Sequence, residues 1–68
     1  MAITLKAARV NADMTRPEVI EHLIGKFGIK ISINTLSNYE NKQSQPGVLI
    51  AKALASIYGV SVNDITFD

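Results

Sequence analysis

The spacing of apolar and polar residues along the chain predicts short helices separated by polar turns. Thr4 is a suitable N-cap for a first helix that runs to about Ala12, with Leu5, Ala8 and Ala12 on its inner face. Arg9 falls on the same face, where a charged side chain requires a partner because burying an unpaired charge is costly. The pattern therefore predicts a partner for Arg9 elsewhere in the chain.

After a short turn, a second helix is predicted to begin at Thr15. Threonine is a good N-cap, Pro17 suits the first turn, and Glu18 completes a capping box with Thr15. The helix should end between Leu23 and Phe27. Apolar side chains expected to face inward here, and in the connection that follows, are Val19, Ile20, Leu23, Phe27, Ile29 and Ile31.

Residues 32–41 predict a third helix with an unusual polar face. One side carries Ser32, a suitable N-cap, with Leu36, Tyr39 and Glu40, and the other side carries Asn34, Ser37, Asn38 and Asn41. Asparagine is a mediocre helix former, so three of them in this stretch weaken the helix. Such amides can be merely solvated, or they can donate and accept hydrogen bonds together at an adenine edge in the DNA major groove.

A fourth helix is predicted after a polar loop. Pro46 suits its first turn, with Ser44 or Gln45 near its cap, and Gly59 suits its C-terminal end. Tyr58 should be a core aromatic with its hydroxyl group at the surface. The inner face follows helical spacing and comprises Ile50, Ala53, Leu54 and Ile57.

The last residues predict a short fifth helix. Ser61 and Asp64 have the spacing of a capping box, which would open a helix around residues 62–66. Ile65 and Phe67 should then close the core. No stretch of the chain predicts a strand, a repeat or a second domain.

Composition narrows the possible functions. The chain has no cysteine, one histidine and a net charge of +1, so disulfides and thiolate metal sites are excluded. No nucleophile–base pair, metal-ligand cluster or Gly-rich phosphate loop occurs, and we expect no enzyme activity, cofactor, metal or small-molecule substrate. No apolar run is long enough to span a membrane, and we expect a cytoplasmic protein. The small net charge is weak support for nucleic-acid binding.

The order of these segments resembles the helix-turn-helix family of Cro and CI-type phage repressors, the XRE family. The segments that carry the resemblance are residues 5–9 (LKAAR), 15–20 (TRPEVI), 32–41 (SINTLSNYEN), Pro46 and 53–65 (ALASIYGVSVNDI). The resemblance implies an all-α fold, a compact five-helix domain like that of lambda repressor, which would span residues 1–68 as a stand-alone domain. The implied function is sequence-specific DNA binding by a transcriptional repressor.

Carried over by position, the resemblance makes residues 32–39 the recognition helix that enters the major groove of an operator. The residues expected to face base edges are Ile33, Asn34, Ser37 and Asn38. The residues expected to bind phosphates are Arg16, which stands where the family usually has glutamine, and Asn41, Lys42 and Gln43. The family also has a charged pair at the positions of Arg9 and Glu40, which would supply the partner that Arg9 requires.

Three features depart from the family pattern. Residues 24–30 lengthen the link to the recognition helix, as in some repressors of temperate phages of Gram-positive bacteria. Lys42 replaces the glycine that commonly follows the Glu-Asn pair. Ile33 replaces a polar residue at the first reading position, where it could pack on a thymine methyl group or face the core.

Two kinds of partner are compatible with a helix-turn-helix domain of this kind. DNA binding predicts Lys and Arg around the recognition helix, a near-palindromic operator, and a weak homodimer or pairing on DNA. The pairing surface is expected within residues 59–67, because Val60, Val62 and Phe67 exceed what a small core encloses. The alternative is a protein-binding module, an antirepressor or antitoxin subunit, which should expose an apolar patch around Val48 and residues 60–62.

Overall fold

The computed structural model describes residues 2–66, which form four α-helices, two other helical turns and two short strands. In chain order the elements are β1 (Ile3–Thr4), α1 (Leu5–Asn11), α2 (Arg16–His22), the π-helical turn η1 (Leu23–Phe27), α3 (Ile33–Glu40), α4 (Val48–Tyr58), the 3-10 turn η2 (Val62–Asp64) and β2 (Ile65–Thr66). The fold is mostly helical, as expected.

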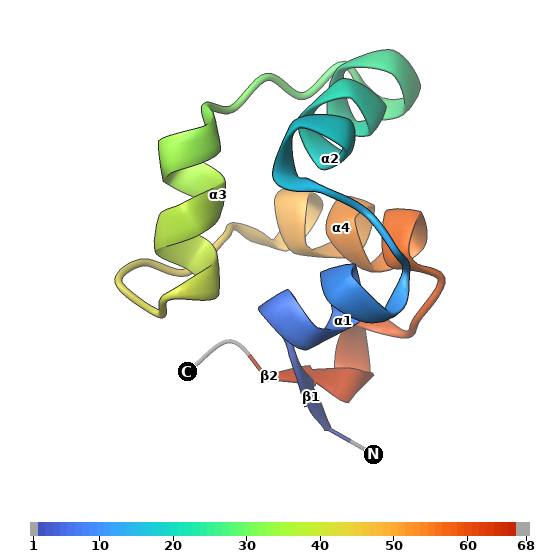
Figure 1. The fold of residues 1–68 in the computed structure, drawn as a ribbon, viewed down its shortest axis with the longest axis vertical. Coiled ribbons are helices and arrows are strands. Elements are labelled where there is room, and N and C mark those ends of the chain that lie inside the picture. Colours follow the sequence, from blue (N-terminus) through green and yellow to red (C-terminus); the bar gives the residue numbers. More distant parts are fainter. Residues whose placement is uncertain (1, 67–68) are drawn as a thin grey trace.

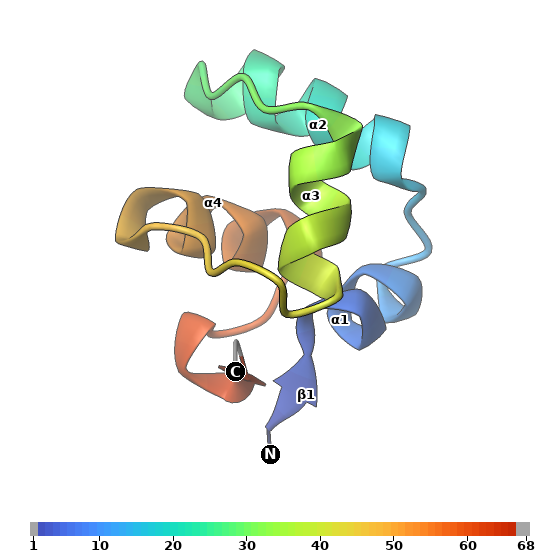
Figure 2. The same ribbon diagram turned by 90° about the vertical axis from the view of Figure 1, so that its left-hand side faces the viewer.

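The four helices surround one apolar core. Figure 1 shows α4 across the middle of the molecule, with α2 above it, α1 below it and α3 to the left. Seen from that left-hand side, α3 stands upright in front of the other helices, so its outer face is open (Figure 2). The buried residues of the core come from every helix and from β2: Leu5, Ala8, Val19, Leu23, Leu36, Ala53, Leu54, Ala55, Tyr58 and Ile65.

Helices α1 and α2 begin where the sequence predicts. The Thr4 hydroxyl oxygen accepts a hydrogen bond from the Ala7 backbone N–H at 3.1 Å. At the start of α2, the Glu18 carboxylate accepts from the Thr15 backbone N–H at 2.9 Å, and the Thr15 hydroxyl oxygen accepts from the Glu18 N–H at 3.4 Å. This reciprocal capping box satisfies two backbone donors at the helix end and sets the direction of α2.

The helical segment that starts with α2 continues through η1 and ends at Gly28. Gly28 has a φ of 66°, a left-handed conformation that glycine adopts without steric cost, and it reverses the chain. Ile29 and Ile31 pack against the core, as predicted. Phe27 was expected inside but is 42% exposed, because the wider π turn displaces the last residues from the stripe expected for an α-helix.

Helix α4 begins slightly later than predicted. Its N-cap is Gly47, so Pro46 precedes the cap, and the prediction that Pro46 lies in the first turn with Ser44 or Gln45 near the cap is wrong. The end of α4 is as predicted, since Gly59 has a φ of 72° and caps the helix in a left-handed conformation.

The predicted fifth helix is wrong beyond its first turn. Ser61 caps only the 3-10 turn η2, accepting from the Asn63 backbone N–H at 3.3 Å. The chain then forms β2, which pairs in parallel with β1 so that Ile3 lies opposite Ile65. Pairing with the distant N-terminal segment extends the backbone here and overrides the local helix signal. Phe67, predicted to close the core, lies outside the described residues.

Candidate nucleic-acid interface

Helix α3 has one face in the core and one face in solvent. The Ser32 hydroxyl oxygen caps its first turn by accepting from the Thr35 N–H at 3.1 Å. Leu36 and Glu40 are buried, whereas Asn34 and Asn38 are exposed on the opposite face. The two amides are one turn apart, so they point from the same side of the helix. The outer face therefore offers amide groups that make no side-chain hydrogen bond in the described part of the chain.

The remaining candidate residues on α3 lie beside these amides. Ile33 is 46% exposed in the first turn, so it lies largely outside the core. Ser37 is half-buried, and its hydroxyl oxygen accepts a hydrogen bond from the Asn41 side-chain amide at 3.4 Å. The surface available on α3 is thus mixed, with one apolar and several short polar side chains.

The chain leaves α3 through a left-handed residue, Lys42, whose φ is 63°. The Lys42 N–H donates to the Tyr39 carbonyl at 3.3 Å, and the Gln43 N–H donates to the Asn38 carbonyl at 2.9 Å. These two bonds form a Schellman motif, which normally has glycine at the left-handed position. Lysine there costs about 1–2 kcal/mol of backbone strain. The turn leaves the Lys42 and Gln43 side chains exposed at the end of α3.

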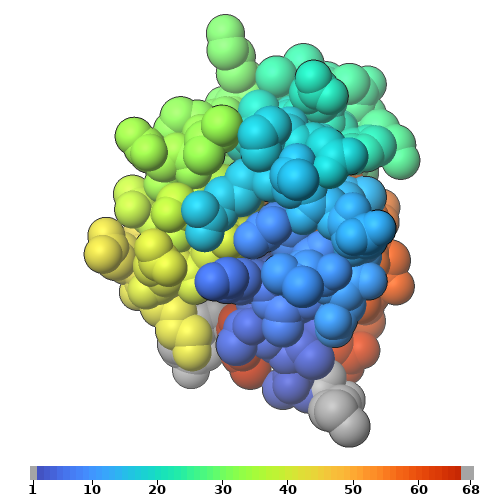
Figure 3. Space-filling view, in the orientation of Figure 1, coloured from blue at the N-terminus to red at the C-terminus, as the bar shows by residue number. Residues whose placement is uncertain are grey.

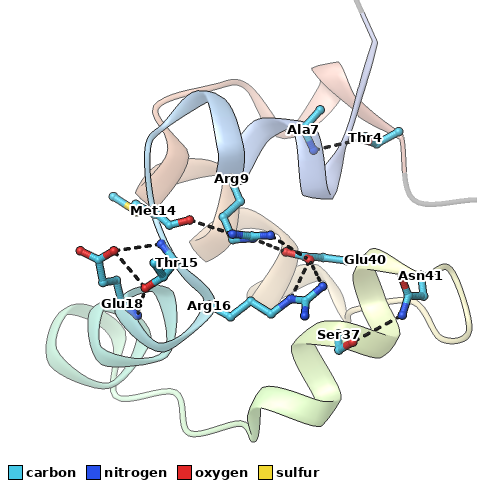
Figure 4. Close-up of polar contacts among 10 residues, drawn as sticks. All are labelled: Thr4, Ala7, Arg9, Met14, Thr15, Arg16, Glu18, Ser37, Glu40 and Asn41. Atoms are coloured by element: carbon cyan, nitrogen blue, oxygen red, sulfur yellow. Dashed lines mark hydrogen bonds and ion pairs between the residues drawn. The ribbon is translucent and has the colours of Figure 1, made fainter.

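The C-terminal end of α3 is held by a cluster of charged side chains centred on Glu40 (Figure 4). The expected pair is present: Arg9 Nε lies 2.7 Å from Glu40 Oε2. Arg9 also donates through Nη1 to the Met14 carbonyl at 2.8 Å. The Glu40 side chain has no exposed surface and that of Arg9 is 12% exposed, so this is a buried ion pair that joins α1 to α3.

Arg16 is the third member of the cluster. Its Nε donates to Glu40 Oε1 at 3.0 Å, and its Nη2 lies 3.0 Å from the same oxygen. Arg16 was expected only as a phosphate ligand, and sequence analysis missed this contact because two basic residues on different helices compete for one acid. One carboxylate thus ties α1, α2 and α3 together. Since two arginines share it, the cluster carries a net charge of +1.

The Tyr58 hydroxyl group is buried and has no hydrogen-bond partner within the described part of the chain. The prediction that this hydroxyl reaches the surface is wrong, because Tyr58 lies on the face of α4 that packs into the core. Burial raises the pKa of Tyr58, the negative charge of Glu40 raises it further, and Arg9 opposes both effects. The phenol therefore stays neutral at physiological pH beside the charged cluster.

The comparison with protein families agrees with this architecture. A family model for the XRE-type helix-turn-helix matches residues 5–65, which is most of the chain. The chain belongs to the XRE-type helix-turn-helix family. Searches of curated proteins and of solved structures found no match. The family is one of DNA-binding regulators that are generally not enzymes, so membership indicates a DNA-binding helix-turn-helix regulator.

In this helix-turn-helix domain, α2 and α3 are the paired helices, and the turn between them is long. Figure 3 shows the start of α2 and the outer part of α3 side by side on one face of the molecule. Among the basic residues, Arg16 opens α2, Lys42 follows the end of α3, and Lys30 precedes the Ser32 cap. Residues 24–30, the expected insertion, form η1, the Gly28 turn and the start of the connection, so most of the insertion lengthens the second helix rather than the loop.

Other surfaces of the helix-turn-helix domain were also candidates. Val60 and Val62 pack against the core and are only partly exposed, so they are not the surplus apolar surface that was expected. The most exposed large apolar residues are instead Val48 and Leu49 in the first turn of α4, at 70% and 80%. Within residues 2–66 there is no group of three potential metal ligands, and no helix is long and apolar enough to cross a membrane.

Proposed function

We propose that this protein is a transcriptional repressor of the Cro/CI type that reads an operator sequence with α3. The observation that carries the proposal is the outer face of α3, where two exposed amides one turn apart make no side-chain hydrogen bond within residues 2–66. A helix fits into the DNA major groove, and amide side chains match the paired donor and acceptor of adenine there. A DNA-binding role would place the protein in the cytoplasm.

Asn34 and Asn38 are the proposed base readers. Both are exposed and project from the same side of α3, so one helix placement brings both to the groove floor. Ser37 lies beside them and can donate or accept. The exposed side chain of Ile33 is suited to the thymine methyl group, which is the apolar feature of the major groove.

The proposed phosphate ligands lie near the C-terminal end of α3, where Arg16 contacts Glu40. Arg16 lies at the start of α2, and Asn41, Lys42 and Gln43 follow the end of α3. The left-handed turn at Lys42 supports this role, because it directs the chain away from α3 while keeping the side chains in solvent. Phosphate contacts of this kind set the register of the helix in the groove but carry no sequence information.

Selection of bound sequences from a random DNA pool tests the proposal. We expect a recovered motif, and we expect Asn34→Ala and Asn38→Ala to lose about 1–3 kcal/mol of affinity for it while binding to random duplex barely changes. Asn63→Ala is the matched control, because Asn63 is an exposed asparagine on η2. Equal losses on the selected and random duplexes would remove the two amides from base reading.

We further propose that two copies bind a near-palindromic operator as a weak homodimer or by pairing on DNA. A single module buries only ~600–1,000 Å² on DNA, which is small for operator selectivity. Two half-sites about one helical turn apart would add the missing contacts. Titration of duplexes with one or two half-sites at varied spacing is the test. Equal affinity per half-site at every spacing would rule out cooperative pairing.

Binding to a protein, as an antirepressor or antitoxin subunit, is the second candidate function. The adjacent exposed side chains of Val48 and Leu49 favour it, since exposed apolar surface is a common feature of protein interfaces. The selection experiment separates the two functions. Failure to recover any motif, together with no binding to random duplex at low salt, would favour the protein-binding role.

A further inference from the structure

Arg9 and Arg16 bind the same carboxylate but use their guanidinium groups differently. Arg9 uses all three nitrogens, with Nε and Nη2 directed to Glu40 and Nη1 to the Met14 carbonyl. Arg16 engages Glu40 through Nε and Nη2, and its Nη1 has no acceptor among residues 2–66. The Arg16 side chain is 31% exposed against 12% for Arg9. One edge of Arg16 is thus held by the protein and the other edge is open.

We infer that Arg16 binds a DNA phosphate with its open edge while Glu40 fixes its other edge, so that an acidic residue is required for DNA affinity. The planar guanidinium group can serve two acceptors at once on different edges, which an ammonium group cannot do with fixed geometry. Glu40 would therefore act as a positioning residue for Arg16. The inference rests on the proposed DNA binding and adds the acid that orients one of its ligands.

Two physical effects follow from this arrangement. Arg16 is already held before DNA arrives, so less side-chain freedom is lost on binding than for a free surface arginine. Glu40 also anchors α3 through the same carboxylate, so the phosphate ligand and the recognition helix share one fixed point. A phosphate bound to Arg16 is thereby placed at a set position relative to α3.

The first test replaces Arg16 with lysine, which keeps the charge but loses the second edge. We expect R16K to bind both the selected duplex and a random duplex about tenfold more weakly, the factor that corresponds to 1.4 kcal/mol. Binding of both duplexes within about twofold of the wild-type protein would overturn the inference, because charge alone would then account for the role of Arg16.

The second test measures the salt dependence of binding. Arg16→Gln should flatten the slope of log affinity against log salt by about 0.9, the value for one lost phosphate contact. Lys52→Gln is the matched control, since it removes one positive charge from an exposed position on α4 outside the cluster. An R16Q slope equal to that of the wild-type protein would show that Arg16 does not contact phosphate, and would overturn the inference.

The third test asks whether removing the charge of Glu40 strengthens or weakens DNA binding. Glu40→Gln makes the protein more positive, so Coulomb attraction alone predicts tighter DNA binding. The inference predicts weaker binding, because Arg16 loses its orienting carboxylate. Tighter binding by folded E40Q would overturn it. Circular dichroism checks that each variant is folded, and R16K, which keeps the Arg9–Glu40 pair, decides the question if E40Q does not fold.

These results also separate the inference from the proposed function. If the wild-type protein binds neither selected nor random duplex, the proposed DNA binding itself fails. If the wild-type protein binds and R16K binds equally well, only the positioning role of Glu40 fails.

Discussion

Helices α3 and α4 contact the same core but are held there in different ways. Helix α4 buries Ala51, Ala53, Leu54, Ala55 and Tyr58, and none of these side chains is charged. Helix α3 buries only Leu36 and Glu40, and Glu40 is held by two arginines from other helices. Apolar packing therefore anchors α4, whereas ion pairs supply much of the anchoring of α3.

The residues that end the two helices also differ. Both end in a left-handed residue, with φ of 72° at Gly59 after α4 and 63° at Lys42 after α3. Glycine adopts this conformation freely, whereas lysine is strained by its Cβ atom. The strained lysine borders the proposed DNA-binding face and the unstrained glycine does not. The difference indicates that α4 is optimised for stability and α3 for the side chains it presents, as is common at functional sites.

Breaking the anchor of α3 should produce the largest change in stability. Glu40→Met leaves Arg9 and Arg16 in a largely buried position without their carboxylate, which should lower the free energy of unfolding by about 3–5 kcal/mol. Urea unfolding monitored by circular dichroism measures the loss.

Leu54→Ala provides the matching change in α4. Leu54 has no exposed surface, so the cavity should cost about 2–5 kcal/mol. If E40M were as stable as the wild-type protein, the inference that ion pairs anchor α3 would be wrong.

Substituting the left-handed residues that end α4 and α3 should change the free energy of unfolding in opposite directions, and by less than the core substitutions do. Gly59→Ala places a Cβ atom in a left-handed conformation with no atom beyond the two neighbouring residues within 4 Å, so only backbone strain of about 1–2 kcal/mol opposes it. Lys42→Gly removes similar strain but adds freedom to the unfolded chain, for a net gain of about 0.5–1 kcal/mol. The K42G protein should also bind DNA more weakly. A loss of stability in K42G would mean that Lys42 contributes more than its conformation costs.

Removing the Tyr58 hydroxyl group tests the apolar character of the α4 anchor. Tyr58→Phe should raise the free energy of unfolding by about 1 kcal/mol or less, because a buried hydroxyl group without a partner is lost. Because the pKa of Tyr58 is raised in the folded protein, the unfolded chain loses the hydroxyl proton at a lower pH than the folded protein does. Wild-type stability should therefore fall above about pH 10, the ordinary tyrosine value, and less steeply in Y58F. Destabilisation by Y58F at neutral pH would reveal a bridging partner for the hydroxyl group.

The smallest effect is expected at the start of α2, where Glu18 is fully exposed. Hydrogen bonds from the Thr15 backbone N–H and hydroxyl group lower the pKa of Glu18 below its ordinary value of 4.5. The capping box therefore contributes stability above that value, and the contribution is lost as pH falls through the folded-state pKa. Glu18→Gln retains a capping-box side chain that does not titrate. Unfolding midpoints at a series of acidic pH values should show a weaker pH dependence for E18Q.

The local signals in the sequence predicted most of the helix boundaries. Thr4, Thr15 and Ser32 cap α1, α2 and α3 as predicted, and Gly59 ends α4. These signals act within a few residues, because a cap depends on the backbone amides that directly follow it. The polar outer face of α3 was equally visible, since side-chain spacing alone assigns residues to the two faces of a helix.

The tertiary structure decided the features that join residues far apart in the chain. Arg16 contacts Glu40 across 24 positions, and β1 pairs with β2 between the two ends of the described chain. Neither contact has a periodic signal, because a two-residue strand is too short to show alternation and a lone arginine does not indicate which acid it will reach. The sequence alone required a partner for Arg9, since an apolar helix face cannot accommodate an unpaired charge. Only the packing of α1, α2 and α3 determined that one carboxylate would serve two arginines and leave one edge of Arg16 open.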